Sequence, residues 1–210
     1  TGKRMGSSIP KQFLLLDNKP IIFHTIEKFH GVVDEIIVVL PESQIDFFIN
    51  LMTQYTFHVP LSIAVGGEER FHSVKRGLKL IQVNTGLVAI HDAVRPLIDK
   101  NTITKAFERA LEMGCCVVAV PSKDSLRKVD GATNRSVPRD HYYLVQTPQV
   151  FDLDLLRQAY DVVYNGFTDD ASVFENAGHH ICLMEGTYAN IKITSPEDLI
   201  IAEALLKMNY

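Results

Sequence analysis

Cysteine and long hydrophobic runs are both scarce in this 210-residue chain. The three cysteines (Cys115, Cys116 and Cys182) are too few for a disulfide framework, and no C-x-x-C spacing offers a zinc or redox site. This thiol content is typical of the reducing cytoplasm, which is the location we expect. The longest apolar stretches, such as 115–121, fall far short of the ~20 residues that span a bilayer, so we expect no transmembrane helix and no membrane partner.

An excess of positive charge is also lacking, because the formal net charge is -4. That value argues against a protein whose whole surface binds nucleic acid, so any anionic ligand must meet a local basic cluster. The 46% hydrophobic and 22% charged residues are typical of a globular protein and exclude disorder, collagen and coiled coil. No linker, repeat or low-complexity tract divides the chain, and its length suits one domain of roughly 100 to 200 residues.

Apolar strand-like segments alternate with helical patterns along the chain. We expect strands at 35–40, 61–65, 86–91, 115–121 and 181–185, and helices at 20–29, 44–55, 71–81, 102–113, 154–164 and 197–208. Strands that are continuous apolar runs between helices predict a mostly parallel sheet covered on both faces, in a three-layer α/β fold. The charged region at 122–149 interrupts the alternation and predicts a protruding β-hairpin arm.

The opening segment combines glycines with basic residues. Lys3, Arg4 and Lys11 accompany Gly2 and Gly6, and such a loop could fold around a polyphosphate with backbone donors and cations. It is not a Walker A loop, and a solvated basic tail is the alternative of about equal weight. Because glycine-rich turns usually follow strands in α/β proteins, we also expect the native chain to have a strand before residue 1.

Two further loops follow predicted strands, at the edge of the sheet where ligands of parallel α/β proteins bind. The first holds Gly66 and Gly67 ahead of a helix whose early turn carries Ser73; it suits close approach of a flat ligand or sugar, although an ordinary turn is the simpler interpretation. The second holds Asp92 and Arg95 in the segment H-D-A-V-R-P, and a structural salt bridge is its alternative interpretation. The signatures G-x-S-x-G, H-E-x-x-H and G-x-G-x-x-G do not occur.

Eight short motifs occur in an order that resembles the 2-C-methyl-D-erythritol 4-phosphate cytidylyltransferase family over essentially the whole chain. They are T-G-K-R-M-G (1–6), P-K-Q-F (10–13), G-G-E-E-R-F-H-S-V (66–74), H-D-A-V-R-P (91–96), V-P-R-D (137–140), Q-T-P-Q (146–149), T-D-D-A-S (168–172) and N-I-K-I-T (190–194). The resemblance implies a Rossmann-like nucleotidyltransferase fold, related to that of nucleotide-sugar pyrophosphorylases, with an arm that builds a homodimer. It implies transfer of a cytidylyl group from CTP to methylerythritol phosphate, with release of pyrophosphate and help from Mg²⁺.

The same resemblance implies roles for individual residues. The catalytic cations would be Arg4, Lys11 and Lys192, and the nucleotide would contact Gly2, Lys3, Gly67, Glu68, Ser73 and Asp92. The acceptor would contact Arg95, Ser125, Arg139 and Thr147, and Asp92 would also lie beside the metal. Ser125 stands where many family members have threonine, which keeps the hydroxyl. The family's residues that precede the loop fall before residue 1, so the nucleotide contacts they make cannot be carried over.

Three other functions are alternatives to the one that this resemblance implies. A cytidylyltransferase for ribitol 5-phosphate or another polyol phosphate shares the fold and most motifs, and only T-D-D-A-S and V-P-R-D favour methylerythritol phosphate. A nucleotide-binding regulator without turnover would be expected to lose a central cation first, yet Arg4, Lys11 and Lys192 are present. A purely structural module explains neither the residues at the strand ends nor their order.

Overall fold

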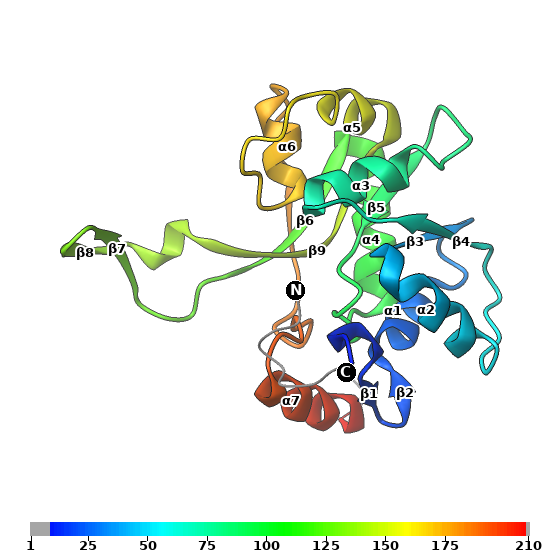
Figure 1. The fold of residues 1–210 in the computed structure, drawn as a ribbon. Helices are drawn as coiled ribbons and strands as arrows, with labels where there is room; N and C mark the ends of the chain where they lie inside the picture. Colours follow the sequence, from blue (N-terminus) through cyan, green and yellow to red (C-terminus); the bar gives the residue numbers. More distant parts are fainter. Residues whose placement is uncertain (1–8, 209–210) are drawn as a thin grey trace.

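The computed structural model of the protein describes residues 9–208, and a mixed sheet lies at its centre (Figure 1). Four strands follow in the order β10-β6-β9-β5. Their bounds are Leu87–Ile90 for β5, Cys115–Pro121 for β6, Tyr143–Asp152 for β9 and Leu183–Glu185 for β10. A separate parallel pair is formed by β3 (Ile36–Leu40) and β4 (Leu61–Val65).

The predicted α/β class is confirmed, with one strand reversed. β10 runs parallel to β6, whereas β9 runs antiparallel to both β5 and β6. β9 is reached through the hairpin of the arm, so the chain returns beside β6 in the opposite direction. The parallel expectation therefore holds for β5, β6 and β10 among themselves, and for the β3–β4 pair.

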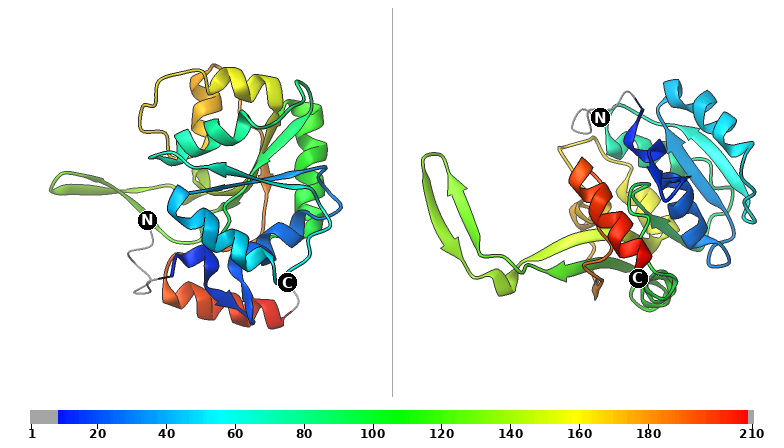
Figure 2. Two further views of the ribbon diagram at one scale, coloured as in Figure 1. Left: turned by 45° about the vertical axis from the view of Figure 1, so that its right-hand side comes forward. Right: turned by 90° about the horizontal axis from the view of Figure 1, so that it is seen from below.

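Helices cover both faces of the central sheet (Figure 2). The helices are α1 (Ile21–Phe29), α2 (Ile45–Met52), α3 (Arg70–Leu78), α4 (Lys100–Met113), α5 (Leu153–Ala159), α6 (Asp170–Asn176) and α7 (Pro196–Lys207). Short elements complete the chain: η1 (Lys11–Phe13), β1 (Leu15–Leu16), β2 (Lys19–Pro20), η2 (Glu42–Gln44), β7 (Leu126–Asp130), β8 (Thr133–Val137) and η3 (Arg139–His141).

The side chains of β6 explain why its sequence is apolar at every position. Cys115 and Val117 pack into the cluster with α3, α5 and α6, while Cys116 and Val118 pack against α4 on the opposite face. A strand covered on both faces has no polar side, so it reads as a continuous hydrophobic run. The three-layer arrangement follows directly from this double coverage.

Several helix starts are fixed by side-chain caps, which satisfy backbone N–H groups left free in the first turn. Asp152 directly precedes α5. Its side chain accepts a hydrogen bond from Leu155 N and so caps the helix. Ser195 and Asp198 form a reciprocal capping box at α7. The helix expected at 154–164 ends earlier, at Ala159; the β-branched pair at 162–163 disfavours its continuation.

The predicted arm is a two-stranded hairpin, β7 and β8, that projects away from the body of the molecule (Figures 1 and 2). The end of the predicted segment belongs to the sheet instead, since residues 146–149 of β9 are buried. Where the arm joins the body, the side chains of Tyr142, Tyr143, Leu144 and Val145 are each 43–52% exposed. Within residues 9–208, no helix has the length and hydrophobicity needed to span a membrane.

Candidate active site

Asp92 is the centre of a charged cluster at the end of β5. Its carboxylate lies 3.0 Å from Lys192 Nζ, 3.3 Å from Arg95 Nε and 4.0 Å from Arg70 Nε. Burial opposes ionisation of this side chain, which is 15% exposed, but Lys192, Arg70 and Arg95 outweigh burial and lower the pKa of Asp92. The site therefore holds a carboxylate whose ionised form is favoured by three neighbouring cations.

Hydrogen bonds from distant segments place these charges. Asp92 N donates to Thr147 Oγ1 at 3.0 Å, which ties the loop after β5 to the neighbouring strand β9. Arg95 Nη1 donates to the backbone carbonyl of Asn190 at 2.7 Å, two residues before Lys192. The loop after β5 and the segment that carries Lys192 are thus fastened to each other. The expected salt bridge between Asp92 and Arg95 exists, as one part of this larger cluster.

The glycine loop between β4 and α3 is folded tightly onto the first turn of the helix. Gly67 N donates to Ser73 Oγ at 3.0 Å, and Ser73 Oγ donates in turn to Glu69 O at 3.1 Å. A Cβ atom added at Gly67 would lie 2.3 Å from His72 Cβ, closer than two carbons can approach. Glycine is required at this position because the backbone passes against the helix, and the exposed Glu68 follows it.

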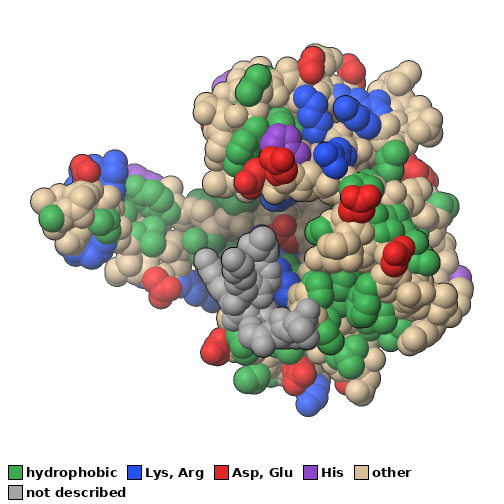
Figure 3. Space-filling model, viewed as in Figure 1, with side chains coloured by type: hydrophobic (Ala, Val, Ile, Leu, Met, Phe, Trp, Pro, Cys, Tyr) green, Lys and Arg blue, Asp and Glu red, His purple; other side chains and the backbone are tan. Residues whose placement is uncertain are grey.

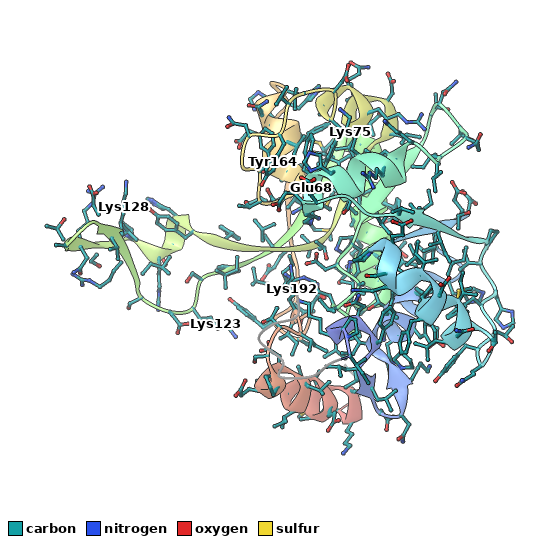
Figure 4. The ribbon with its side chains drawn as sticks, viewed as in Figure 1. Glu68, Lys75, Lys123, Lys128, Tyr164 and Lys192 are labelled. Carbon is teal, nitrogen blue, oxygen red and sulfur yellow. The ribbon has the colours of Figure 1, made fainter. Side chains whose placement is uncertain are left out.

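The described surface is hollowed between the glycine loop and the segment of Lys192. Figure 3 shows acidic and basic side chains within this recess, below the part of the surface formed by α3. In Figure 4, Glu68 lies above the recess and Lys192 below it. A ligand seated there would meet the loop on one side and the charges around Asp92 on the other.

The structure brings together only some of the expected site residues. Asp92, Arg95, Thr147 and Lys192 form one cluster, and Gly67, Glu68 and Ser73 form the neighbouring loop. Lys11 opens η1, a turn anchored by the buried Phe13, and its role stays a prediction. Gly2, Lys3 and Arg4 lie outside the described residues.

Ser125 and Arg139 lie on the arm rather than at Asp92. Both residues are exposed. Arg139 Nη1 donates to Lys123 O at 2.7 Å, and Arg139 Nε lies 3.8 Å from Asp140 Oδ1. Because the arm projects away from the body, the two side chains are available to a neighbouring molecule (Figure 1).

Five buried or half-buried polar residues support the site but were given no role from the sequence: Arg70, Gln146, Gln149, Asp170 and Asn190. The Arg70 guanidinium donates hydrogen bonds to both carboxylate oxygens of Asp170, at 2.9 and 2.5 Å, and also faces Asp92. Gln149 Oε1 accepts from the backbone N–H groups of Asp170 and Ala171. Asn190 Nδ2 donates to Gln146 Oε1 and to Thr147 O. Each of these residues lies in one of the eight motifs given above, so the motifs could have marked them as candidates. Which motifs contact one another is shown only by the fold.

The carboxylate set limits how a metal ion could bind. Within residues 9–208, no three acidic, histidine or cysteine side chains are grouped to hold a metal ion. Asp92 supplies an ionised carboxylate at the centre of the charged cluster. A lone carboxylate fits Mg²⁺, which commonly binds through one or two protein oxygens and completes its shell with water and substrate phosphates.

Comparison with known proteins points to a single family. A sequence profile of 2-C-methyl-D-erythritol 4-phosphate cytidylyltransferase matches residues 1–208. The enzyme of that name from Bacteroides thetaiotaomicron is 46% identical over 208 residues, covering 98% of this chain and 94% of the relative. That from Clostridioides difficile is 41% identical over 215 residues, covering 99% of this chain and 90% of the relative.

Solved structures agree with the sequence comparison. The 4-diphosphocytidyl-2C-methyl-D-erythritol synthase of Anaerococcus prevotii superposes with a TM-score of 0.85 at 28% identity, covering 93% of each chain. The 2-C-methyl-D-erythritol 4-phosphate cytidylyltransferase of Thermus thermophilus superposes with a TM-score of 0.78 at 31% identity, covering 94% of each chain.

Proposed function

The chain belongs to the 2-C-methyl-D-erythritol 4-phosphate cytidylyltransferase family, and we propose that it transfers a cytidylyl group from CTP to 2-C-methyl-D-erythritol 4-phosphate. The products would be 4-diphosphocytidyl-2-C-methyl-D-erythritol and pyrophosphate, in non-mevalonate isoprenoid biosynthesis. The observation that carries the proposal is the ionised Asp92 surrounded by Lys192, Arg95 and Arg70, next to the glycine loop.

The reaction requires two polyanions to approach each other. A phosphate oxygen of the acceptor attacks the α-phosphorus of CTP, and the bond from that phosphorus to the bridging oxygen of pyrophosphate breaks. Charge spreads over the phosphoryl oxygens in the transition state, so positioned cations are the main catalytic requirement. Lys192 supplies such a cation at the recess, and Arg4 and Lys11 are proposed to serve the triphosphate.

The two sides of the recess suit different parts of the substrates. The glycine loop offers close backbone approach for the base and ribose, with Gly67, Glu68 and Ser73, and with Gly2 and Lys3 as further proposed nucleotide contacts. Arg95 and Thr147 would lie by the acceptor. Asp92 would hold Mg²⁺ together with phosphate oxygens and water, and the ion would neutralise charge on the phosphates.

The exposed arm supports a homodimer in which Ser125 and Arg139 serve the partner's site. Tyr142, Tyr143, Leu144 and Val145 place four large apolar side chains on the surface where the arm begins. Such a patch is typical of a protein interface. A second copy seated there would cover the patch and receive the guanidinium of Arg139. Free thiols at Cys115, Cys116 and Cys182 suit the cytoplasm as the site of the reaction.

The direct test measures pyrophosphate release from CTP and Mg²⁺ with two acceptors in parallel. Methylerythritol phosphate should support turnover with a kcat/KM at least tenfold above that for ribitol 5-phosphate. Faster turnover with ribitol 5-phosphate would assign the alternative acceptor. Binding of CTP without turnover of either acceptor would make the chain a nucleotide-binding regulator.

A further inference from the structure

Arg70 joins the two halves of the recess. It is the first residue of α3 and directly follows the glycine loop. Its guanidinium binds both carboxylate oxygens of Asp170, at 2.9 and 2.5 Å, and its Nε lies 4.0 Å from the carboxylate of Asp92. One side chain thus contacts an anchor on α6 and faces the charged centre after β5.

The anchor is rigid. Asp170 is completely buried, and Tyr160 donates its hydroxyl to Asp170 Oδ1 at 2.6 Å. The backbone N–H of Asp170 donates to Gln149 Oε1, a side chain of the central strand β9. A bidentate pair with a carboxylate held in this way leaves the Arg70 guanidinium one orientation. Asp170 therefore fixes Arg70 with respect to the sheet.

The ion pair with Asp170 leaves part of the Arg70 side chain exposed. Its side chain is 32% exposed, whereas its partner Asp170 is 0% exposed. A residue whose only task was to neutralise Asp170 would need no second carboxylate. The charges of Asp170 and Asp92 are instead bridged by a single planar cation, which holds the end of the glycine loop at a set position relative to Asp92.

We infer that Arg70 is a positioning residue, which uses the Arg70–Asp170 pair to hold the glycine loop and the Asp92 carboxylate in register for the nucleotide. This inference rests on the proposed function, because the nucleotide is what spans the loop and Asp92. Small displacements of positioned groups cost phosphoryl-transfer enzymes heavily, because their catalysis is mostly positioning.

The first test is Arg70→Lys, which keeps the positive charge beside Asp170 but loses the planar fork. Lysine can bind one carboxylate and cannot orient a second. We expect the kcat/KM for CTP to fall roughly tenfold to hundredfold, and CTP affinity measured by calorimetry to weaken at least threefold. A kcat/KM within twofold of the wild-type value would overturn the inference.

The second test is the double variant Arg70→Gln with Asp170→Asn, which removes both charges of the pair. A single Arg70→Gln change would leave a buried carboxylate unpaired and could prevent folding, but the double variant leaves no buried charge alone. We expect it to melt close to the wild type while its turnover stays at least tenfold lower. If turnover returned to within twofold of the wild type, Arg70 would serve only to neutralise Asp170.

Arg157→Gln is the matched control at the other end of α3. Arg157 donates to the carbonyls of Leu78, Ile81 and Val83, and so ties the end of that helix to α5 without facing the recess. This variant should lower the melting temperature but keep kcat and the KM for CTP. If Arg157→Gln lost as much activity as Arg70→Lys, general loosening of α3 would explain both, against the inference.

The wild-type chain, measured in the same assay, separates this inference from the proposed function. Absence of wild-type turnover with methylerythritol phosphate would reject the function. Calorimetry with CTP would still test the role of Arg70. Equal CTP affinity of the wild type and Arg70→Lys would reject the positioning role, and weaker CTP binding by the variant would support it.

Discussion

Lys192 and Asp92 form a close ion pair, with the ammonium nitrogen 3.0 Å from the carboxylate, although they are far apart in the sequence. The lysine remains 41% exposed, while the carboxylate is 15% exposed. The pair places a cation at the edge of the recess and keeps the carboxylate ionised. Phosphates that enter the recess would compete with Asp92 for the same ammonium group.

Replacing Lys192 with glutamine should lower kcat by about a hundredfold, because a positioned cation is lost from the charge that develops on the phosphate. Its melting temperature should change little, since the lysine is partly exposed. The rate of pyrophosphate release at saturating substrate concentrations would measure kcat. Lys75→Gln is the matched control: Lys75 lies on α3 and faces Asp161 at 3.7 Å, so its loss should leave kcat unchanged. Equal kcat values for Lys192→Gln and the wild type would contradict a catalytic role.

Adding a methyl group at Gly67 should disturb the glycine loop. The new Cβ would lie 2.3 Å from His72 Cβ, so the loop must move away from α3. We expect Gly67→Ala to weaken CTP binding at least tenfold in calorimetry, because the loop is proposed to hold the base and ribose. Ser73→Ala removes the hydroxyl that accepts from Gly67 N without introducing a clash, and should weaken binding less. Unchanged CTP affinity in Gly67→Ala would separate the loop from the nucleotide.

The sequence predicted the layers of the fold well, because apolar periodicity reports which faces are covered. β6 was expected at 115–121 and is found there, with both faces packed. The reversal of β9 was not predicted. Strand direction depends on where the chain goes after a hairpin, and the polar composition of the arm carried no signal for that path.

The site was predicted in part, for a related reason. Asp92, Arg95, Thr147 and Lys192 were named, and they do meet. Arg70 was overlooked although it stands in the glycine motif, because its partner Asp170 lies in a different motif far along the chain. A charged residue reads as solvent-exposed until its buried partner is known, and only the fold pairs the two.

Arg139 should contribute to acceptor binding in a neighbouring subunit. Its guanidinium offers a planar fork for phosphate that lysine cannot reproduce, so Arg139→Lys should raise the KM for the acceptor roughly tenfold and leave that for CTP nearly unchanged. Arg135→Lys, on β8 of the same arm, is the control and should change neither constant. The alternative is that Arg139 only forms its exposed pair with Asp140, worth about 0 to 1 kcal/mol, in which case the acceptor KM would not move.

Mixing two impaired chains tests whether sites are shared between subunits. Arg139→Ala damages the arm, and Lys192→Gln damages the recess. If the arm reaches the partner's recess, a heterodimer of the two should contain one intact site, so mixing should restore up to half of the wild-type activity per heterodimer. Native mass spectrometry would establish that subunits exchange. Exchange without recovered activity would place Arg139 and Lys192 in the same subunit's site.

His91 should make stability depend on pH between about 4 and 6.5. Burial lowers the pKa of His91 to about 4, and its Nε2 lies 3.1 Å from Arg95 O. The unfolded chain therefore takes up this proton at a higher pH than the folded chain does. The stabilisation is present above pH 6.5 and is lost as the pH falls toward 4.

The linkage predicts that His91 alone removes about 2 kcal/mol of unfolding free energy between pH 7.5 and pH 5. Because carboxylates also titrate at low pH, the measurement is the difference between the wild type and His91→Gln in urea unfolding at both values. His91→Gln should be less stable at pH 7.5, since the buried imidazole packs against Phe29. The gap should shrink or reverse at pH 5, because glutamine takes up no proton. A gap of the same size at both pH values would mean that His91 protonates equally easily in the folded and unfolded chains.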